Sequence, residues 1–275
     1  MEGFLKKYEI QKESEKKPIT HTSMNGGKWS IPQKKFKKFY KLIKNNVING
    51  DENIPLVEKM RDYFPFVIDI DLKYNDVIEE RQYTSETKEV LLEYIWSVIN
   101  ECIQIDDNSS KGIALFMEKD KPYPCNKQNF KSKDGIHIGF PELIVEKQVF
   151  KKIIQKLQEG NQIKEIFINT CEIPPDNENN QILDSSFSSW QSYGCSKDGE
   201  SPYLVTQVYK FADDGYPEEM EDDLIEEFYN DPVDLMEMMS MCYRKESNVT
   251  LTEEFSKTFK QKTSKKINVN SMVQN

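Results

Sequence analysis

The chain has 275 residues, of which 37% are hydrophobic and 31% are charged, and it carries a net charge of -10. No apolar run approaches the ~20 residues that a membrane-spanning helix needs, and the N-terminus lacks the apolar stretch of a signal peptide. The five cysteines are odd in number and show no Cys-x2-Cys spacing, which argues against a disulfide framework and a zinc module. We therefore expect a cytosolic or nuclear protein with no membrane partner, made of one large domain or of one domain with a lobe and tails.

The negative charge is concentrated in one segment near the C-terminus. Between residues 211 and 243 the chain has no lysine or arginine but has twelve acids: Asp213, Asp214, Glu218, Glu219, Glu221, Asp222, Asp223, Glu226, Glu227, Asp231, Asp234 and Glu237. The remaining residues carry a slightly positive net charge, so the overall acidity does not exclude a nucleic-acid partner. We expect a disordered N-terminus at 1–20, a main domain at 21–210, an acidic and partly helical segment at 211–245, and a Lys-rich tail or linker at 246–275.

The first part of the main domain has a basic helix. Apolar residues recur at helical spacing from residue 36 to residue 47, after a turn signal at 25–27, and lysines fill the other faces of this predicted helix. Such a basic side is either a solvated surface or a contact for the phosphates of a template, and the pattern favours neither. The candidates for nucleic-acid binding are Lys28, Lys34, Lys38 and Lys41.

Two aspartates end an apolar strand in the segment from Pro65 to Tyr74. Because strand side chains alternate between faces, Asp69 and Asp71 share one face and the neighbouring isoleucines share the other. Two like charges side by side cost stability, and divalent cations such as Mg2+ or Mn2+ turn that cost into a binding site. A bare Asp-x-Asp also occurs by accident in solvated turns, so this motif alone leaves both readings open.

Strands and helices alternate through the rest of the domain. We expect a long helix that begins at Thr84 or Ser85 and is buried as far as Cys102, and a second helix that buries residues 149–157. The predicted strands lie at 112–117, within 131–141, near 166–168 and at 202–209, and short helices are expected at 224–229 and 233–243. An α+β fold is expected from the family resemblance given below, and this alternation of strands and helices fits it.

Three further stretches carry polar residues beside these elements. Lys133, Gly135 and His137 place a cation, an approachable backbone and an imidazole within five residues, which suits a phosphate group. A lone histidine beside an apolar strand is nevertheless more often structural than functional. Asp184 follows an apolar pair and Lys197 lies in a Gly/Ser loop, and each of these residues is unremarkable when it is considered alone.

The three motifs together are more specific than any one of them. In chain order the sequence has strand Asp-x-Asp, then small-x-His, then apolar-Asp followed by Tyr-Gly-Cys-Ser-Lys. This order resembles the archaeo-eukaryotic primase superfamily, and most of all the primase domains at the N-termini of primase-helicases of nucleocytoplasmic large DNA viruses, the African swine fever virus and giant-virus type. The resemblance extends over roughly residues 20–210. It implies a catalytic domain at 21–210 with an RRM-like half and a mixed or antiparallel sheet flanked by helices.

The resemblance also implies the roles of single residues. Asp69, Asp71 and Asp184 match the acids that bind two divalent metal ions, Mg2+ or Mn2+, and with His137 they make up the expected catalytic set. The expected nucleotide-binding residues are Lys133, Gly135, His137, Ser196 and Lys197. The family often has serine where Gly135 stands, and primase-polymerases often have arginine where Gln191 stands.

By this resemblance the chain is a template-dependent DNA primase or primase-polymerase, a nucleotidyltransferase of viral DNA replication in the host cytoplasm. Its implied partners are a single-stranded DNA template, nucleoside triphosphates and a helicase domain or subunit; no Gly-x4-Gly-Lys-Ser/Thr loop occurs in this sequence. Two alternatives stay open. A metal-dependent nuclease would use the same acids but has no triphosphate for Lys133 and Lys197 to hold. A catalytically degenerate, primase-like module would bind nucleic acid without catalysis.

Overall fold

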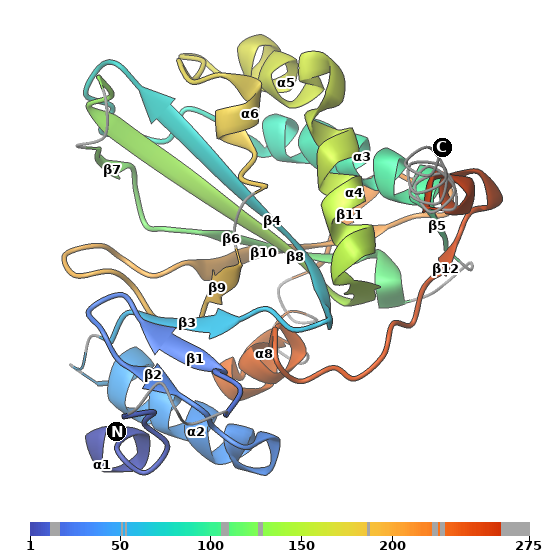
Figure 1. The fold of residues 1–275 in the computed structure, drawn as a ribbon. Coiled ribbons are helices and arrows are strands. Elements are labelled where there is room, and N and C mark those ends of the chain that lie inside the picture. Colours follow the sequence, from blue (N-terminus) through green and yellow to red (C-terminus); the bar gives the residue numbers. More distant parts are fainter. Residues whose placement is uncertain are drawn as a thin grey trace, which may run out of the picture.

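Figure 1 shows the computed structural model, which describes residues 1–11, 17–50, 52, 54–105, 110–125, 129–185, 188–221, 225 and 229–259. The described elements combine helices with antiparallel sheets, so the predicted α+β class is confirmed. No helix among the described residues has the length and apolar character needed to cross a membrane.

The larger sheet is built around two long neighbouring strands, β4 (Tyr63–Tyr74) and β8 (Ser132–Glu146). Its order is β11-β10-β6-β8-β4, where β6 is Ile113–Glu118, β10 is Leu204–Phe211 and β11 is Pro217–Glu219, and the short β7 (Tyr123–Pro124) also pairs with β8. Both long strands extend well beyond the apolar runs that predicted them. Pairing with β4 holds the polar first part of β8 in extended form, which the local sequence pattern does not indicate.

Three helices pack together beside this sheet: α3 (Ser85–Cys102), α4 (Lys147–Gln158) and α5 (Gln162–Thr170), with the short α6 (Asn179–Ile182) next to β4. Helix α3 begins with a capping box, in which Thr84 and Thr87 exchange side-chain and backbone hydrogen bonds. Its Trp96 stacks on Phe211 of β10 at a centroid distance of 4.4 Å, which joins the helix layer to the sheet. Short 3-10 turns lie at Ser110–Gly112 and Glu159–Asn161.

The predicted strand near residues 166–168 is wrong, because this segment belongs to helix α5. A short apolar run does not distinguish a buried strand from a buried helix. Here Ile163, Ile166 and Phe167 are buried at helical spacing, while Ile168 is 42% exposed. The period of burial is therefore that of a helix.

A second, smaller sheet lies beneath the first in Figure 1, in the order β2-β1-β3-β9. Its strands are β1 (His21–Ser23), β2 (Lys28–Trp29), β3 (Leu56–Lys59) and β9 (Ser189–Gln191). Around it lie α1 (Glu2–Leu5), α2 (Phe36–Ile43) and α8 (Pro232–Met238); α2 is preceded by the 3-10 turn Gln33–Lys35 and followed by the π-helix Lys44–Ile48. Trp29 is buried in the core of this lobe.

One buried carboxylate ties the smaller lobe to the segment after α8. Glu58 of β3 is 4% exposed and accepts hydrogen bonds from the Tyr40 hydroxyl at 2.8 Å, the Ser240 hydroxyl at 3.0 Å and the Met241 amide at 2.6 Å. It also pairs with the fully buried His21, whose Nε2 lies 3.1 Å away. Polar contacts of this one side chain therefore join β3 to three other parts of the chain: β1, α2 and residues 240–241.

The described parts of the segments at 1–20 and 246–275, for which we expect a disordered N-terminus and a Lys-rich tail or linker, make contacts with the rest of the chain. Helix α1 buries Leu5, and the backbones of Tyr8 and Ile10 bond to residues 30 and 28 beside β2. At the other end β12 (Thr250–Leu251) pairs with β5 (Ile103–Gln104), and Phe255 is 7% exposed in a helical stretch at 253–259. In both terminal segments a few widely spaced apolar residues are buried, and these hold the surrounding polar residues against the rest of the chain. Residues 12–16 and 260–275 lie outside the described residues, as does most of the predicted helix at 224–229.

Candidate active site

The register between β4 and β8 aligns the polar residues of two motifs. Asp69 faces His137 and Asp71 faces Gly135, while Lys133 stands opposite Lys73. Directly opposed residues of antiparallel strands project to the same side of the sheet. The intervening isoleucines of both strands, which project to the other side, are completely buried in the core. One face of this strand pair is thus apolar and the other carries ionisable groups.

Each aspartate of β4 is paired with a cationic or imidazole side chain of β8. Lys133 Nζ forms an ion pair with Asp71 Oδ1, and His137 Nε2 lies 3.5 Å from Asp69 Oδ1. The side chains of Asp69 and Asp71 are 23% and 20% exposed, so both carboxylates remain accessible from the surface. The two strands therefore present paired charges at an open face.

The third acid reaches the same strand through its backbone. Leu183 forms an isolated antiparallel bridge with Ile70, and the Asp184 amide donates to the Asp69 carbonyl at 3.0 Å. By strand alternation, Asp184 lies on the same side of the strand as Asp69. The sequence stretches around 70, 137 and 184 therefore meet at one place, although more than a hundred residues separate the first from the last.

Asn177 fixes the segment that delivers Asp184, and the sequence analysis did not identify it. This side chain is 1% exposed; its Nδ2 donates to the Asp71 carbonyl at 2.8 Å and its Oδ1 accepts from the Lys73 amide at 2.9 Å. The amide side chain thus takes the place of a neighbouring strand along the edge of β4. An asparagine in a polar, proline-containing loop carries no sequence signal for such a role.

Burial and neighbouring charges shift the ionisation of this centre. Burial raises the pKa of Asp69, but the hydrogen bond and charge of His137 and the charges of Lys133 and Lys197 lower it overall. Burial and the charge of Asp69 raise the pKa of Asp71, against the effect of Lys133. Burial lowers the pKa of Lys133, but the charge and hydrogen bond of Asp71, together with Tyr123 and the charge of Asp69, raise that pKa overall. Two adjacent carboxylates repel one another here, and the surrounding cations compensate.

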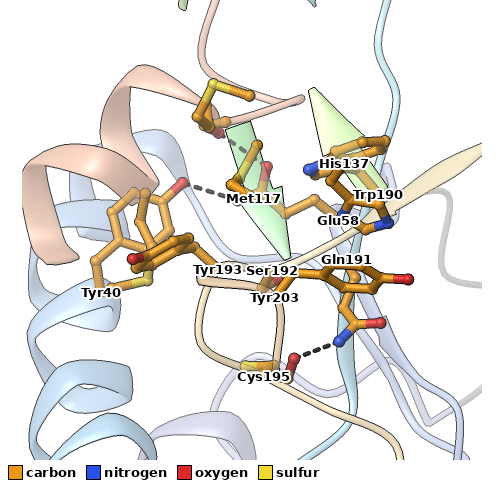
Figure 2. Close-up of a pocket in the computed structure, with 13 residues that line it drawn as sticks. Tyr40, Glu58, Met117, His137, Trp190, Gln191, Ser192, Tyr193, Cys195 and Tyr203 are labelled. Carbon is orange, nitrogen blue, oxygen red and sulfur yellow. Dashed lines mark hydrogen bonds between the residues drawn. The ribbon is translucent and has the colours of Figure 1, made fainter. Parts of the chain in front are cut away.

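The predicted residues 195–197 come close to this centre from a separate loop. Lys197 is exposed and its charge acts on Asp69, which places the ammonium within electrostatic range of the acids. Ser196 is 7% exposed, and the neighbouring Gly194 and Gly199 have positive φ values of 75° and 78°, which shape the turns on either side. Gln191 is tied to this loop, since its side-chain amide donates to the Cys195 carbonyl (Figure 2).

Aromatic rings enclose the imidazole of His137. The ring of Tyr203 stacks on it at a centroid distance of 3.6 Å and an angle of 13°, and that of Trp190 lies at 4.3 Å. Figure 2 shows His137 and Trp190 side by side on one side of a cavity, with Tyr40 on the opposite side. Neither aromatic residue was a sequence candidate, because Trp190 lies in a serine-rich stretch and Tyr203 in a predicted strand. Their packing restricts the orientation of the imidazole.

Gly135 is required by the same aromatic ring. A Cβ at this position would overlap the Tyr203 hydroxyl oxygen and would lie 3.1 Å from Tyr203 Cζ. Position 135 in the second motif therefore excludes any residue larger than glycine, because the hydroxyl of Tyr203 occupies the space that a side chain would fill.

We expect Gly135→Ala to destabilise the protein by about 1–3 kcal/mol, because the added methyl group overpacks this position. Tyr203→Phe removes the hydroxyl oxygen that clashes with the added methyl group. We therefore expect the double variant to lose less free energy of unfolding than the two single variants lose together. Urea denaturation of the four proteins measures this coupling. Strictly additive changes in unfolding free energy would contradict the steric explanation.

The predicted nucleic-acid-binding lysines lie elsewhere. Lys28 is on β2, Lys34 is in the 3-10 turn before α2, and Lys38 and Lys41 are on α2; all four are exposed. They belong to the smaller lobe and make no described contact with Asp69 or Asp71. We refer to the exposed parts of β2, the 3-10 turn and α2 that carry these four lysines as the α2 surface.

The acids have the chemistry of a divalent-metal site, because carboxylate oxygens are the ligands that Mg2+ and Mn2+ prefer. Among the residues that the structure describes, however, no three or more His, Cys, Asp or Glu side chains are grouped closely enough to hold a metal ion. The carboxylate oxygens of these acids suit such ions. In this structure the carboxylates of Asp69 and Asp71 contact His137 and Lys133.

Comparison with known proteins defines the class to which this α+β domain and its acidic centre belong. Residues 20–209 match the family described as "C962R protein N-terminal AEP domain", an archaeo-eukaryotic primase domain. The chain belongs to this family. The matched region includes Asp69, His137, Asp184 and Lys197 and ends within β10.

Three curated viral proteins are similar over most of this chain. They are "Putative helicase 121R" of Invertebrate iridescent virus 3 (29% identical over 66% of this chain), "Putative helicase L207/L206" of Acanthamoeba polyphaga mimivirus (26% over 75%) and "Putative helicase 184R" of Invertebrate iridescent virus 6 (25% over 69%). The alignments cover 20%, 21% and 21% of those proteins. The chain thus spans about a fifth of the length of these relatives.

Proposed function

We propose that this chain is a template-dependent DNA primase that extends ribonucleotides or deoxyribonucleotides by nucleotidyl transfer in viral-type DNA replication. The observation that carries the proposal is the meeting of three motifs: Asp69 and Asp71 of β4 stand against Lys133 and His137 of β8, and Asp184 joins them along the free edge of β4. Transfer of a phosphoryl-linked group requires acids that lie next to phosphate-binding cations.

In this proposal Asp69, Asp71 and Asp184 hold two divalent ions, Mg2+ or Mn2+. Such ions stabilise the charge on the attacking and leaving oxygens of an in-line displacement. Because Lys133 now contacts Asp71, the proposal requires the Lys133 side chain to turn from this carboxylate towards the nucleotide. His137 is held between the rings of Tyr203 and Trp190 and would contact the nucleotide from its present place beside Asp69.

The cationic residues would hold the triphosphate. His137, kept in place by the stacked ring of Tyr203, and Lys133 would contact phosphate oxygens from β8, while Ser196 and Lys197 would approach from the loop. Gly135 lies between them, and its missing side chain leaves room for the Tyr203 hydroxyl. Fixing the triphosphate in line with the attacking hydroxyl is the main contribution that positioning makes to such a reaction.

The template would lie across the α2 surface, through Lys28, Lys34, Lys38 and Lys41. These exposed side chains would contact the phosphates of single-stranded DNA without reading its sequence, so binding is expected to weaken as salt concentration rises. A helicase domain or subunit is the proposed partner, because the relatives are named helicases and are about five times longer than the aligned region. The host cytoplasm is the proposed compartment.

The proposal predicts primer synthesis on unprimed single-stranded DNA in the presence of Mn2+ or Mg2+. Ribonucleotide and deoxyribonucleotide pools, assayed separately with a labelled nucleotide, identify the sugar that is incorporated. Labelled single-stranded DNA incubated without nucleotides serves as the control for a nuclease. Degradation of that DNA, with no product longer than one nucleotide, would contradict the proposal.

A catalytically degenerate, nucleic-acid-binding module is the second candidate. It is favoured by the ion pair between Lys133 and Asp71, by the contact of Gln191 with its own loop, and by the lack of a ready metal-holding group among the described side chains. Metal-dependent thermal stabilisation by a nucleoside triphosphate, lost in Asp184→Ala, is expected of the primase and not of the degenerate module. Primer synthesis separates them, because only the primase extends a chain.

A further inference from the structure

Lys119 is a buried cation close to the proposed triphosphate site, and neither the sequence motifs nor the proposed mechanism uses it. It follows the last residue of β6 and is 3% exposed. Its ammonium pairs with Glu200 and lies 3.7 Å from the ring centroid of Tyr123 and 5.2 Å from that of Tyr203. A lysine so deeply buried is costly, which marks it as a candidate for a specific role.

The aromatic contacts connect Lys119 to both phosphate-binding residues of β8. Tyr123 pairs across the strands with Lys133, whose ammonium lies 6.0 Å from the same ring. Tyr203, the second ring near Lys119, is the one that stacks on His137. Lys119 therefore shares one aromatic neighbour with each of these two residues, and all of them lie on the polar side of the sheet.

Three lysines converge on this small region. Burial lowers the pKa of Lys119, and the positive charges of Lys197 and Lys133 lower it further, while Glu200 opposes both effects. Mutual repulsion of ammonium groups destabilises the arrangement unless anions lie between them. A polyphosphate supplies several negative charges at once, which a single carboxylate does not.

A half-buried arginine sets the position of the Lys119 backbone. Arg81 Nη2 donates to the Lys119 carbonyl at 2.7 Å, and its other nitrogens pair with Glu118 at 2.9 Å and with Asp134 at 3.1 Å. Asp134 is the residue next to Lys133, so one guanidinium holds the ends of β6 and β8 in register. The two lysines thus emerge from a shared rigid base.

The partner of Lys119 is more loosely held than Lys119 itself. The side chain of Glu200 is 24% exposed, and this residue follows Gly199 in the same turn that carries Lys197. A carboxylate on a glycine-containing loop can move away from a lysine that is itself fixed by strand and ring contacts.

We propose that Lys119 is a third phosphate-binding lysine of the nucleotide site and that Glu200 is an exchangeable partner which the triphosphate displaces. The inference rests on the proposed function, since it takes the nucleotide to lie between β8 and the 196–200 loop. It adds a residue from a strand that none of the three motifs contains, and it assigns Glu200 the role of a competing anion.

Equilibrium binding by the full chain tests this assignment. ATP and inorganic tripolyphosphate are titrated with Mg2+, and adenosine serves as the probe without phosphate. We expect Lys119→Met to weaken ATP and tripolyphosphate binding by about tenfold or more, because a charged phosphate contact is lost. Lys121→Met, which removes an exposed lysine two residues away, is the matched control and is expected to change affinity by less than about twofold.

Glu200→Gln gives the decisive result because its expected effect has the opposite sign. The amide retains the shape and a polar contact but removes the competing charge, so affinity for ATP and tripolyphosphate is expected to rise by about threefold. A purely structural ion pair would instead make both Lys119→Met and Glu200→Gln weaken binding through loss of the loop. That outcome, or unchanged binding in Lys119→Met, overturns the inference.

The same titrations separate this inference from the proposed function. If the unmodified chain binds ATP and tripolyphosphate and makes primers, but Lys119→Met binds them equally well, only the role of Lys119 is refuted. If the unmodified chain binds neither probe and makes no primer, the proposed function fails and the inference fails with it. Melting temperatures of all variants confirm that each comparison is made between folded proteins.

Discussion

Asp69→Ala is expected to abolish metal-dependent primer synthesis, with a loss of at least about a thousandfold, while the fold remains intact. The carboxylate is the centre of the proposed site: it lies beside His137, its backbone carbonyl holds the Asp184 amide, and nearby cations lower its pKa. Removing one preorganised charge from such a centre typically costs about a hundredfold to a thousandfold, and loss of a metal ligand costs more. Primer yield on unprimed DNA measures the effect.

The fold is expected to survive because the side chain of Asp69 is 23% exposed and alanine leaves the backbone bond to Asp184 in place. Asp76→Ala is the matched control, since this aspartate follows the same strand but its side chain is 87% exposed. The control should retain full primer synthesis and an unchanged melting temperature. Undiminished synthesis by Asp69→Ala would refute the assignment of the site.

Glu58→Ala is expected to cause the largest loss of stability, about 3–5 kcal/mol, because it breaks a buried charged network by removing one partner. The substitution leaves the hydroxyls of Tyr40 and Ser240, the Met241 amide and the His21 ring without their common acceptor. Each unsatisfied buried group costs about 1–3 kcal/mol before the structure relaxes. Urea denaturation followed by circular dichroism measures the change.

Glu58→Gln keeps the shape and one acceptor oxygen, so it should be milder than the alanine variant. The surface control is Glu253→Ala, whose carboxylate is 86% exposed and pairs only with Lys257 four residues along the same helical stretch. An exposed pair of this kind is worth about 0.5 kcal/mol or less. Equal destabilisation by Glu58→Ala and Glu253→Ala would show that the buried network contributes nothing.

Features that depend on local periodicity could be predicted from the sequence. The shared face of Asp69 and Asp71 follows from the two-residue repeat of a strand, and the burial of the neighbouring isoleucines agrees with it. The long helix after Thr84 could be predicted from its capping residue and its apolar spacing. These inferences need no knowledge of distant contacts.

Features that depend on pairing between distant segments could not be predicted in the same way. Nothing in the apolar-Asp pair at 183–184 indicates that it bridges to Ile70; only the order of motifs suggested that the acids belong together. Asn177, Tyr203 and Lys119 act through contacts with strands far away in the chain, and none has a local pattern that marks it. Side-chain roles of this kind arise from tertiary structure alone.

The contacts made after residue 209 bear on how this protein should be produced in the laboratory. The family match ends inside β10, yet Ser240 and Met241 satisfy Glu58, Met236 fills the core of the smaller lobe, and Phe255 is buried against the larger one. A recombinant fragment trimmed to the matched boundary would expose these surfaces and leave the carboxylate without two donors. The matched family region is therefore shorter than the set of residues that packs together in this structure.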